Sequence, residues 1–334
     1  MAVASRRPRL AVVISVLILT FNFIQRTQLS MVPAVGDFSG AQCIVTGASS
    51  GIGLEVAWGF AKEGAHVVMA CRDLDRCERA RRDLLTRVPT VSHSQFHLSC
   101  SQLDLSSPAS IRNFASLQRQ KMTKDVRTVL VANAGVMGAP CDTSNFAAAD
   151  GHLWPNHFGH FLLANLLLPG MGVGSCLVVV ASRAHWQGRL RICADDRIDP
   201  NVGGGHWYFR YARSKLCNVL FASEWRRRLP AGPTCVAVSP GRVATQIFDT
   251  VPAPFGWLLR LLAQQFFQTP AQGASHVLAA AKLAFASGDP SDSPLYLHLG
   301  KPSIPSAAAS DPKLAAALWH ASEAEVGLRD PHRQ

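Results

Sequence analysis

The chain has 334 residues, of which 48% are hydrophobic and 16% charged, and its formal net charge at pH 7 is +11. This composition is typical of a globular protein with a large core and excludes a disordered or fibrous chain. The basic residues are dispersed, with neither zinc-finger spacing nor an aromatic-rich RNA-binding signature, so we expect no nucleic-acid partner. The densest clusters, at residues 81–82 and 226–228, lie at the polar ends of predicted helices. We expect these clusters to be solvated helix ends, and the alternative is that they attract a membrane surface or an anionic cofactor.

The nine cysteines are scattered from Cys43 to Cys235 without a C-x-x-C pair. Cys43, Cys71, Cys176 and Cys235 fall in apolar runs typical of strands, where a thiol acts as a small buried hydrophobe. The spacing therefore indicates neither a zinc site nor a disulfide framework. We expect a folded domain in a reducing environment, with no bound metal.

The N-terminal segment, residues 1–31, is basic and then hydrophobic. Arg6, Arg7 and Arg9 precede an uncharged run over residues 10–24, which is shorter than the ~20 residues that cross a bilayer upright. A secretory signal has a similar start, but no clear A-x-A cleavage site follows, and residues 30–34 offer only weaker ones. We expect an uncleaved anchor through residues 10–24, in the endoplasmic reticulum or another organelle membrane. A cleaved or targeting segment is the second interpretation and a buried core helix the third.

A linker at residues 32–40 is followed by alternating strand-like and helix-length segments. Near-continuous apolar strands indicate burial on both faces, and strand–helix alternation is typical of a doubly wound parallel sheet. The predicted strands cover residues 41–46, 65–71, 96–104, 127–133, 175–181, 234–239 and 295–299. The predicted helices include residues 52–62, 74–87, 108–119, 157–168 and 215–228.

One α/β domain of Rossmann type, with helices on both faces of its sheet, is therefore expected over residues 41–328, with a tail at 329–334. No repeat or interdomain linker interrupts it. Residues 301–312, rich in alanine and proline, predict a loop that leads to a last helix at about 314–324.

A glycine-rich loop joins the first strand to the first helix. Gly47, Gly51 and Gly53 permit a tight turn and a close approach of the backbone to a pyrophosphate, which the helix N-terminus would hold. Ser49, Ser50 and Ile52 lie between them, and we expect all six residues to bind a dinucleotide.

The same loop also reads G-x-S-x-G around Ser49, the nucleophile elbow of α/β-hydrolases. A hydrolase would need an acid and a histidine, for which His185, His206 or His276 could serve. That elbow normally follows several strands, whereas this one follows the first. A hydrolase would also leave the Tyr211–Lys215 pair unexplained.

The end of the second strand selects the cofactor in dinucleotide folds, since an acidic residue there binds the ribose of NAD. Here Cys71 takes that position and Arg72 follows, and a guanidinium suits the 2′-phosphate of NADP. Alternatively, Arg72 pairs with Asp73 or Asp75. Asp104, at the end of the third strand, could accept from the adenine amino group or cap the following helix.

The chain resembles the short-chain dehydrogenase/reductases. The residues that carry the resemblance, in order, are Thr46, Gly47, Gly51, Ile52, Gly53, Asn133, Ala134, Gly135, Ser182, Tyr211, Lys215, Pro240 and Gly241. It is closer still to the branch of the retinol dehydrogenases and protochlorophyllide reductases, through residues 70–73, 135–137, 156–161, 214–221 and the C-terminal residues 318–328. The ordered set covers residues 38–328.

The resemblance implies an NADP(H)-dependent oxidoreductase acting on a lipophilic, retinoid-like carbonyl or alcohol, and it leaves a homo-oligomer open. It also implies a catalytic tetrad of Asn156, Ser182, Tyr211 and Lys215. Further residues would surround the cofactor: Asn133, Ala134 and Gly135 beside the sheet, and Pro240, Gly241 and Thr245 at the nicotinamide. Pro155 departs from the pattern and could bend the helix that positions Asn156.

The chemistry follows from the spacing of the Tyr–Lys pair. A free tyrosine, with a pKa of ~10, is a poor base at neutral pH. Lys215 lies one helical turn from Tyr211, and its charge, with that of oxidised nicotinamide, is expected to lower the tyrosine pKa. Tyr211 then exchanges a proton with the substrate oxygen, Ser182 hydrogen-bonds that oxygen, and Asn156 supports a relay water. Tyr208 is a competitor, but no lysine lies four residues after it.

Three interpretations stay open at this stage. His157 and His160 could suggest a metal but are expected to pack or form hydrogen bonds, because no carboxylate accompanies them. Residues 189–207 and 248–269 are expected to line the substrate pocket. A cofactor-binding regulatory or scaffold protein without turnover is the alternative function, although it would not need the trio of Ser182, Tyr211 and Lys215.

Overall fold

The structure is a computed structural model that describes residues 38–89, 95–138, 151–195, 197–199, 202, 206–247, 267–287 and 293–328. The anchor expected at residues 10–24, most of the linker and the C-terminal tail lie outside these residues. Within them, no helix combines the length and the apolar character that a bilayer crossing requires.

The described strands form one sheet of eight, in the order β3-β2-β1-β4-β5-β6-β7-β8. All neighbours are parallel except β7 and β8. The strands are β1 (Gln42–Thr46), β2 (His66–Cys71), β3 (Leu98–Gln102), β4 (Thr128–Ala132), β5 (Cys176–Val180), β6 (Thr234–Ser239), β7 (Tyr296–His298) and β8 (Lys301–Pro302). The order reverses between β1 and β4, so the predicted doubly wound sheet is confirmed.

Burial explains why the central strands form where the apolar runs predicted them. Every residue of β4, β5 and β6 is buried, as expected for strands covered by helices on both faces. The predicted loop at residues 301–312 was wrong in part, because it contains β8 and the short 3-10 helix η7 (Ala308–Ser310).

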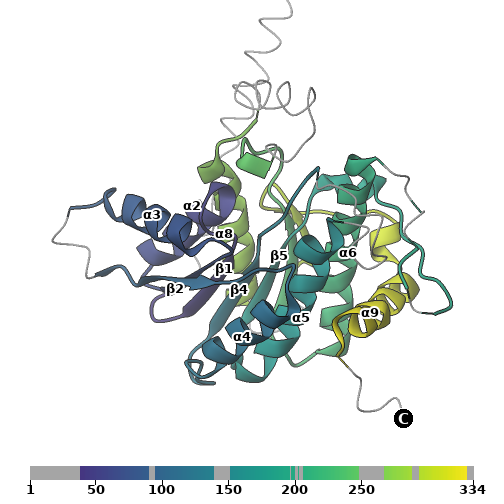
Figure 1. The fold of residues 1–334 in the computed structure, drawn as a ribbon, viewed down its shortest axis with the longest axis horizontal. Coiled ribbons are helices and arrows are strands. Elements are labelled where there is room, and N and C mark those ends of the chain that lie inside the picture. The colour runs from purple at the N-terminus through teal and green to yellow at the C-terminus, as the bar shows by residue number, and fades with distance from the viewer. Residues whose placement is uncertain are drawn as a thin grey trace, which may run out of the picture.

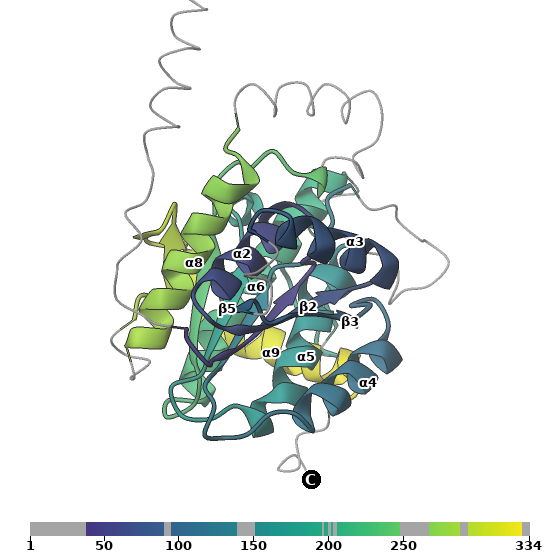
Figure 2. The same cartoon turned by 90° about the vertical axis from the view of Figure 1, so that its left-hand side faces the viewer.

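Helices cover both faces of the sheet (Figure 1). One face carries α2 (Gly51–Lys62), α3 (Leu74–Leu85) and α8 (Pro270–Ala286). The other carries α4 (Pro108–Arg119), α5 (Gly159–Leu167) and α6 (Trp207–Arg228). Helix α8, which the sequence pattern left unassigned, lies beside α2 (Figure 2). Gly59 permits this approach, because a Cβ there would lie 2.4 Å from Leu278 Cδ1.

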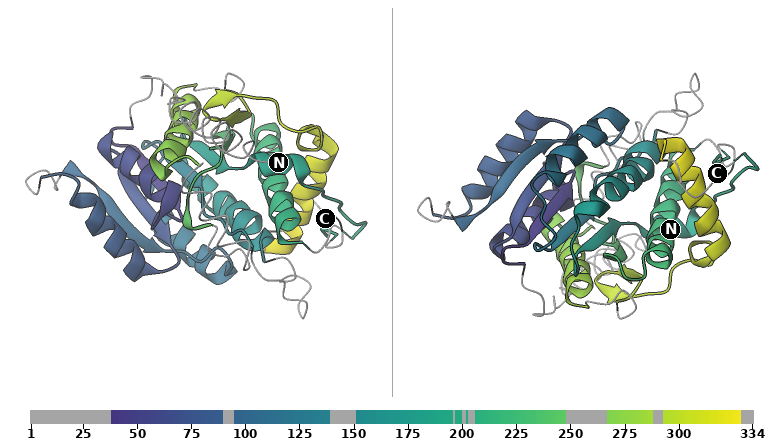
Figure 3. Two further views of the ribbon diagram at one scale, coloured as in Figure 1. Left: turned by 90° about the horizontal axis from the view of Figure 1, so that it is seen from above. Right: turned by 90° about the horizontal axis from the view of Figure 1, so that it is seen from below.

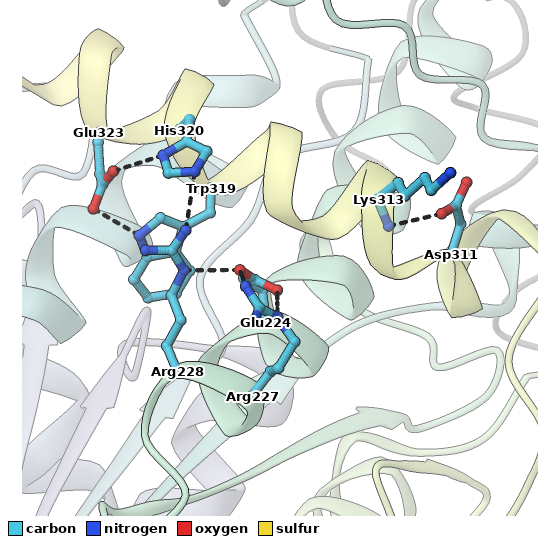
Figure 4. A network of polar contacts seen from close by, with 8 residues as sticks. All are labelled: Glu224, Arg227, Arg228, Asp311, Lys313, Trp319, His320 and Glu323. Carbon is cyan, nitrogen blue, oxygen red and sulfur yellow. Dashed lines mark hydrogen bonds and ion pairs between the residues drawn. The ribbon is translucent and has the colours of Figure 1, made fainter. Parts of the chain in front are cut away.

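The last helix, α9 (Pro312–Val326), packs beside α6 and covers its outer side (Figure 3). The contact includes a buried carboxylate, Glu224, which accepts hydrogen bonds from Arg227 Nε at 2.7 Å and Arg228 Nε at 2.8 Å. The Arg228 guanidinium lies 4.8 Å from the Trp319 ring centroid and also contacts His320 (Figure 4). The basic cluster lies at the end of α6 with Arg227 exposed, as expected, but two of its arginines also neutralise a buried acid.

A disulfide joins Cys77 of α3 to Cys100 of β3. The expectation that no disulfide is present was wrong, because residues 23 apart in sequence become neighbours only when α3 packs on the sheet. The four cysteines of the predicted strands are buried free thiols, as expected: Cys43, Cys71, Cys176 and Cys235.

Candidate active site

A cleft of about 1280 Å³ opens where the parallel strands end. In doubly wound sheets ligands bind at this edge, beside the point where the strand order reverses. Most residues expected to form the cofactor and catalytic site line the cleft: Thr46, Gly47, Ser49, Ser50, Gly51, Ile52, Gly53, Arg72, Asp104, Asn133, Ala134, Gly135, Ser182, Tyr211, Lys215, Pro240, Gly241 and Thr245. Asn156 stands behind this wall and is fully buried.

The glycine loop needs its glycines for two different reasons. Gly47 and Gly51 have φ values of +67° and +59°, which L side chains rarely adopt. Gly53 is required by proximity, since a Cβ there would lie 2.5 Å from both Asn133 Nδ2 and the carbonyl oxygen of Gly47. The loop therefore presents bare backbone to the cleft, with Ser50 as the residue before α2.

The hydrolase interpretation of the same loop finds no support. His185 bonds to Ser182 and Ser306, and His276 to Gln268. The third candidate, His206, accepts from the backbone of Tyr208. None of the three is thus bonded to Ser49, the residue that a hydrolase would use as its nucleophile.

Thr46 ties the glycine loop to the neighbouring strand end. Its hydroxyl accepts from the backbone N–H groups of Asn133 and Ala134, each at 2.9 Å. Asn133 Nδ2 in turn donates to the Thr46 carbonyl at 2.8 Å. The Thr46 hydroxyl also meets His160 Nε2 at 2.9 Å. Asn133 and Ala134 thus lie against the glycine loop.

His157 and His160 form hydrogen bonds, as expected. His157 Nε2 lies 2.9 Å from the hydroxyl of Ser322 in α9. Burial lowers the pKa of His157 to about 3 and that of His160 to about 4, so both rings are neutral. No cluster of metal-ligating side chains occurs among the described residues.

Arg72 lines the cleft next to Cys71, the last residue of β2. Within the described part of the chain it forms no ion pair with Asp73 or Asp75; Asp73 instead caps α3 by accepting from Arg76 N at 2.9 Å. A second guanidinium, Arg76, which the sequence did not single out, also lines the cleft and donates to Gln246.

Asp104 lies just ahead of α4, one of the two roles left open, but it does not cap that helix. Its carboxylate accepts from Ser106 N at 2.9 Å, whereas the N-cap of α4 is Ser107. The Asp104 N–H donates to the Ser110 hydroxyl at 3.0 Å. These bonds hold the residue at the wall of the cleft.

Asn156 lies in a π-helical turn, η2 (Trp154–Phe158), that precedes α5. Pro155 thus stands in an irregular turn rather than in a regular α-helix, since proline lacks an N–H and disturbs the α-helical ladder. The Asn156 amide is fixed at both ends: Oδ1 accepts from Val136 N at 2.8 Å, and Nδ2 donates to Val136 O at 3.0 Å and to Ser214 Oγ at 2.9 Å.

Tyr211 and Lys215 lie one turn apart on α6 and are both buried. Lys215 Nζ lies 5.7 Å from the Tyr211 ring centroid and donates to Val180 O at 2.9 Å. Ser182 lies two residues after the end of β5, and its hydroxyl accepts from Ala184 N at 3.2 Å. The fold thus brings together residues from η2, from the segment after β5 and from α6. Asn156 and Lys215, the most distant of them in sequence, are 59 positions apart.

The lowered tyrosine pKa was expected with oxidised nicotinamide beside Lys215, and the chain alone does not have it. Burial raises the pKa of Tyr211 to about 12, and a hydrogen bond from Ser182 offsets only part of this. Burial also lowers the pKa of Lys215 to about 8. Desolvation penalises both charged forms and is the largest cause of each shift.

The cleft also contains residues that the sequence did not assign, among them Met137, Trp186, Tyr208, Arg242 and His298. Their signal could not be read locally, because they come from different parts of the chain: Trp186 from η4, Tyr208 from α6 and His298 from β7 (Tyr296–His298), with Met137 and Arg242 outside any helix or strand. The expected pocket segments were right only in part. Of the described residues at 189–207, only Trp207 lines the cleft, whereas Phe267 and Gln268 represent the second segment and residues 248–266 lie outside the described chain.

Comparison with known proteins agrees with this arrangement. Residues 41–194 match the family model described as short chain dehydrogenase. The chain is 33% identical to Retinol dehydrogenase 13 from Homo sapiens, over 90% of this chain and 88% of that protein. It is 37% identical to Dehydrogenase/reductase SDR family member 13 from Homo sapiens, over 88% of this chain and 75% of that protein.

A solved structure of an uncharacterised protein from Mycobacterium paratuberculosis is 31% identical and superposes with a TM-score of 0.67, covering 90% of this chain and 98% of that one. The identities extend over most of the chain, well beyond the matched family model. They include the region after residue 194 that carries Tyr211, Lys215 and the terminal helix. The chain therefore belongs to the short-chain dehydrogenase/reductase family of oxidoreductases, with retinol dehydrogenases among its relatives.

Proposed function

We propose that this protein is an NADP(H)-dependent oxidoreductase that interconverts a carbonyl and an alcohol on a lipophilic, retinoid-like substrate. The observation that carries the proposal is the meeting of Ser182, Tyr211 and Lys215 in the same cleft as the bare glycine loop. A proton donor and a dinucleotide cradle are the two parts that direct hydride transfer requires.

The cradle fits a dinucleotide. Gly47, Gly51 and Gly53 leave space that a Cβ would fill, and the N-terminus of α2 directs free N–H groups toward the loop. Such a helix end favours the negative charge of a pyrophosphate. The apolar wall of Met137 and Val180 offers a dry place for the nicotinamide.

The preference for NADP(H) rests on the part of the cleft around Cys71 and Arg72, where the adenosine would lie. Cys71 occupies the position at which an acid would bind the ribose hydroxyls of NAD, and a thiol that burial keeps protonated, with a pKa of about 11, does not repel a phosphate. Arg72 lies beside it without a carboxylate partner in the described chain, and Arg76 adds a second positive charge. Two guanidiniums suit the doubly charged 2′-phosphate.

Tyr211 is the proton donor for reduction and the acceptor for oxidation. Its burial keeps the hydroxyl protonated, which suits donation to a carbonyl oxygen as negative charge develops there. The Lys215 ammonium holds the ribose and stabilises the phenolate that remains, while Ser182 orients the substrate oxygen. The bound nicotinamide supplies or accepts the hydride, so the chain itself contributes binding, orientation and the proton.

A lipophilic substrate suits the mouth of the cleft. Trp186, Trp207, Ile247 and Phe267 line it, and Trp186 is 54% exposed. Large apolar surfaces at a pocket mouth favour an apolar ligand. The relative named Retinol dehydrogenase 13 supports a retinoid-like compound, since it shares one third of its residues with this chain.

A screen tests the function directly. NADPH oxidation by the full-length protein should be measured with retinals, steroid ketones and long-chain aldehydes, and retinals or long-chain aldehydes should be reduced fastest. Saturable NADPH binding without turnover of any carbonyl would instead favour a scaffold protein. A tenfold preference for NADH would overturn the cofactor assignment.

We also propose that residues 10–24 anchor the domain at residues 41–328 to an endoplasmic reticulum or other organelle membrane. Full-length protein should stay in the pellet after carbonate extraction, and a chain beginning at Val35 should not. A mature N-terminus near residue 30, read by mass spectrometry, would show a cleaved signal and overturn the anchor.

A further inference from the structure

His185 is a fully buried histidine behind Ser182 that the proposed chemistry does not use. It lies in the short helix η4 (Arg183–Gln187), for which Ser182 is the N-cap. His185 Nδ1 is 2.7 Å from the carbonyl oxygen of Ser182, and the backbone N–H of His185 donates to the same oxygen at 3.1 Å. The ring therefore adds a second restraint to the backbone of the serine.

The other ring nitrogen identifies the tautomer. Ser306 N donates to His185 Nε2 at 3.1 Å, and a backbone N–H can only donate. Nε2 must therefore carry a lone pair, and a neutral imidazole then has its single proton on Nδ1. That proton points at the Ser182 carbonyl. Both bonds are satisfied only by the neutral Nδ1–H form, because a second ring proton would oppose the Ser306 N–H.

The surroundings of the ring favour this neutral form. Burial lowers the pKa of His185, and the positive charge of Arg183 in the same helix lowers it further. From β7, Tyr296 packs edge-on at 5.1 Å between ring centroids and His298 lies near enough to interact. From α6, Tyr211 approaches through Ser182. The segment at Ser306, which runs Pro-Ser-Ala-Ala-Ala, brings no titratable side chain.

The Ser306 end of the contact is itself well held. Its hydroxyl accepts from Ala309 N at 3.3 Å, and its carbonyl accepts from Ser310 N at 3.0 Å, so it starts the turn η7 that leads into α9. Residues 185 and 306 are 121 positions apart. The His185 ring is thus a bridge between the turn that carries Ser182 and the C-terminal segment.

We propose that His185 is a positioning residue of the active site, whose neutral Nδ1–H ring holds the Ser182 carbonyl against Ser306 so that the serine hydroxyl faces Tyr211. The inference rests on the proposed function, since it assumes that Ser182 and Tyr211 act on the substrate oxygen. Loss of the bridge releases the turn that carries Ser182. Turnover then falls more than NADPH binding, because the glycine loop lies on a different part of the sheet.

Two substitutions separate the two hydrogen bonds. In His185→Asn the side-chain amide nitrogen replaces Nδ1 and keeps the bond to Ser182, whereas in His185→Gln the longer amide reaches Ser306 and loses it. We expect His185→Gln to lower kcat by roughly tenfold to a hundredfold, as small misplacements of reacting groups do. His185→Asn should retain kcat within about threefold, with the NADPH dissociation constant unchanged in both.

His157→Gln is the matched control. His157 is buried to a similar degree but bonds to Ser322 of α9, away from the cleft. The His157→Gln variant should lower the midpoint temperature of thermal unfolding while leaving kcat within about threefold of wild type. Equal kcat losses in His185→Asn and His185→Gln, or a loss as large in His157→Gln, would mean that burial of any histidine matters and would overturn the positioning role.

A measurement on the wild-type chain does not depend on the variants folding. With ¹⁵N-labelled histidine in the full-length protein, the signal absent from His185→Asn should show a protonated Nδ1 and an unprotonated Nε2 at neutral pH. A doubly protonated ring or the Nε2–H tautomer would overturn the inference. If instead Tyr211→Phe keeps wild-type turnover, the proposed function fails, whatever the state of His185.

Discussion

The Asn156 side chain donates to the hydroxyl of Ser214 at 2.9 Å, and that hydroxyl donates to the carbonyl of Tyr211 at 2.7 Å. The two bonds join the π-helical turn to α6, the helix that carries Tyr211 and Lys215. The position of the asparagine is therefore set jointly by this helix and by Val136, in the segment that follows β4.

Ser214→Ala tests this connection. The Asn156 amide keeps its two bonds to Val136, so we expect the free energy of unfolding to fall by only about 1 kcal/mol and kcat by less than tenfold. Asn156→Ala removes all three bonds and should lower kcat further. Urea denaturation and steady-state kinetics check both variants, and a smaller kcat loss in Asn156→Ala than in Ser214→Ala would contradict this order.

Tyr211→Phe tests the proton donor. Only the hydroxyl is removed, so the fold and NADPH binding should survive while kcat falls by ~10²–10⁴. Fluorescence titration with NADPH and turnover should be measured on the same sample. Tyr208→Phe is the matched control, since its hydroxyl is bonded to Gln187 at 2.6 Å, and its loss of kcat should be much smaller. Wild-type turnover in Tyr211→Phe would show that the proton comes from another group.

Lys215→Ala tests the charge beside that tyrosine. Without the ammonium, the phenolate loses its stabilising charge, so the ionisation in the pH profile of alcohol oxidation should move to higher pH. Because burial alone raises the pKa of Tyr211 to about 12, the wild-type profile with cofactor bound should lie below this value. NADPH affinity should fall as well, and an unmoved profile with unchanged affinity would count against both roles of Lys215.

Arg72→Ala tests cofactor selection. Because a charged hydrogen bond to the 2′-phosphate is lost, the KM for NADPH should rise by roughly tenfold or more. The KM for NADH should stay nearly unchanged. Cys71→Asp should add discrimination against NADPH through charge repulsion. Arg119→Ala, on α4 away from the cleft, is the control for the loss of one positive charge and should alter neither KM. Equal changes for both cofactors would remove the basis for the assignment.

The buried histidines predict how stability depends on pH. The pKa of His157 lies at about 3 and that of His160 at about 4 in the folded protein, against 6.5 for a free histidine. Below pH 6.5 the unfolded chain takes up protons that the folded chain does not, so stability is complete above 6.5 and falls toward pH 4. Each histidine contributes a slope of about 1.4 kcal/mol per pH unit. Urea denaturation across this range should show a shallower slope in His157→Gln than in wild type.

How far the sequence predicted the site can be judged from individual residues. The glycine loop and the Tyr211–Lys215 pair were found because their chemistry depends on short spacings, a tight turn in one case and one helical turn in the other. Asn156 was found through the resemblance, and Pro155 indicated an irregular helix there without specifying the π-helical turn. The raised pKa of Tyr211 in the chain alone was not foreseen, because the depth of burial is not written in a four-residue motif.

By itself, the sequence determined the order of strands and helices, the buried central strands and the loop that would hold a phosphate. These features follow from periodicity and backbone freedom within a few residues. Only the tertiary structure decided that Cys77 meets Cys100, that Glu224 lies buried beside Arg228, and that His185 bridges Ser182 to Ser306. The Cys77–Cys100 and His185–Ser306 contacts join segments that become neighbours only when helices and strands pack. Glu224 and Arg228 both lie in α6, but Glu224 is buried because α9 covers that helix. Packing is a property of the whole chain, and so is the site that it assembles.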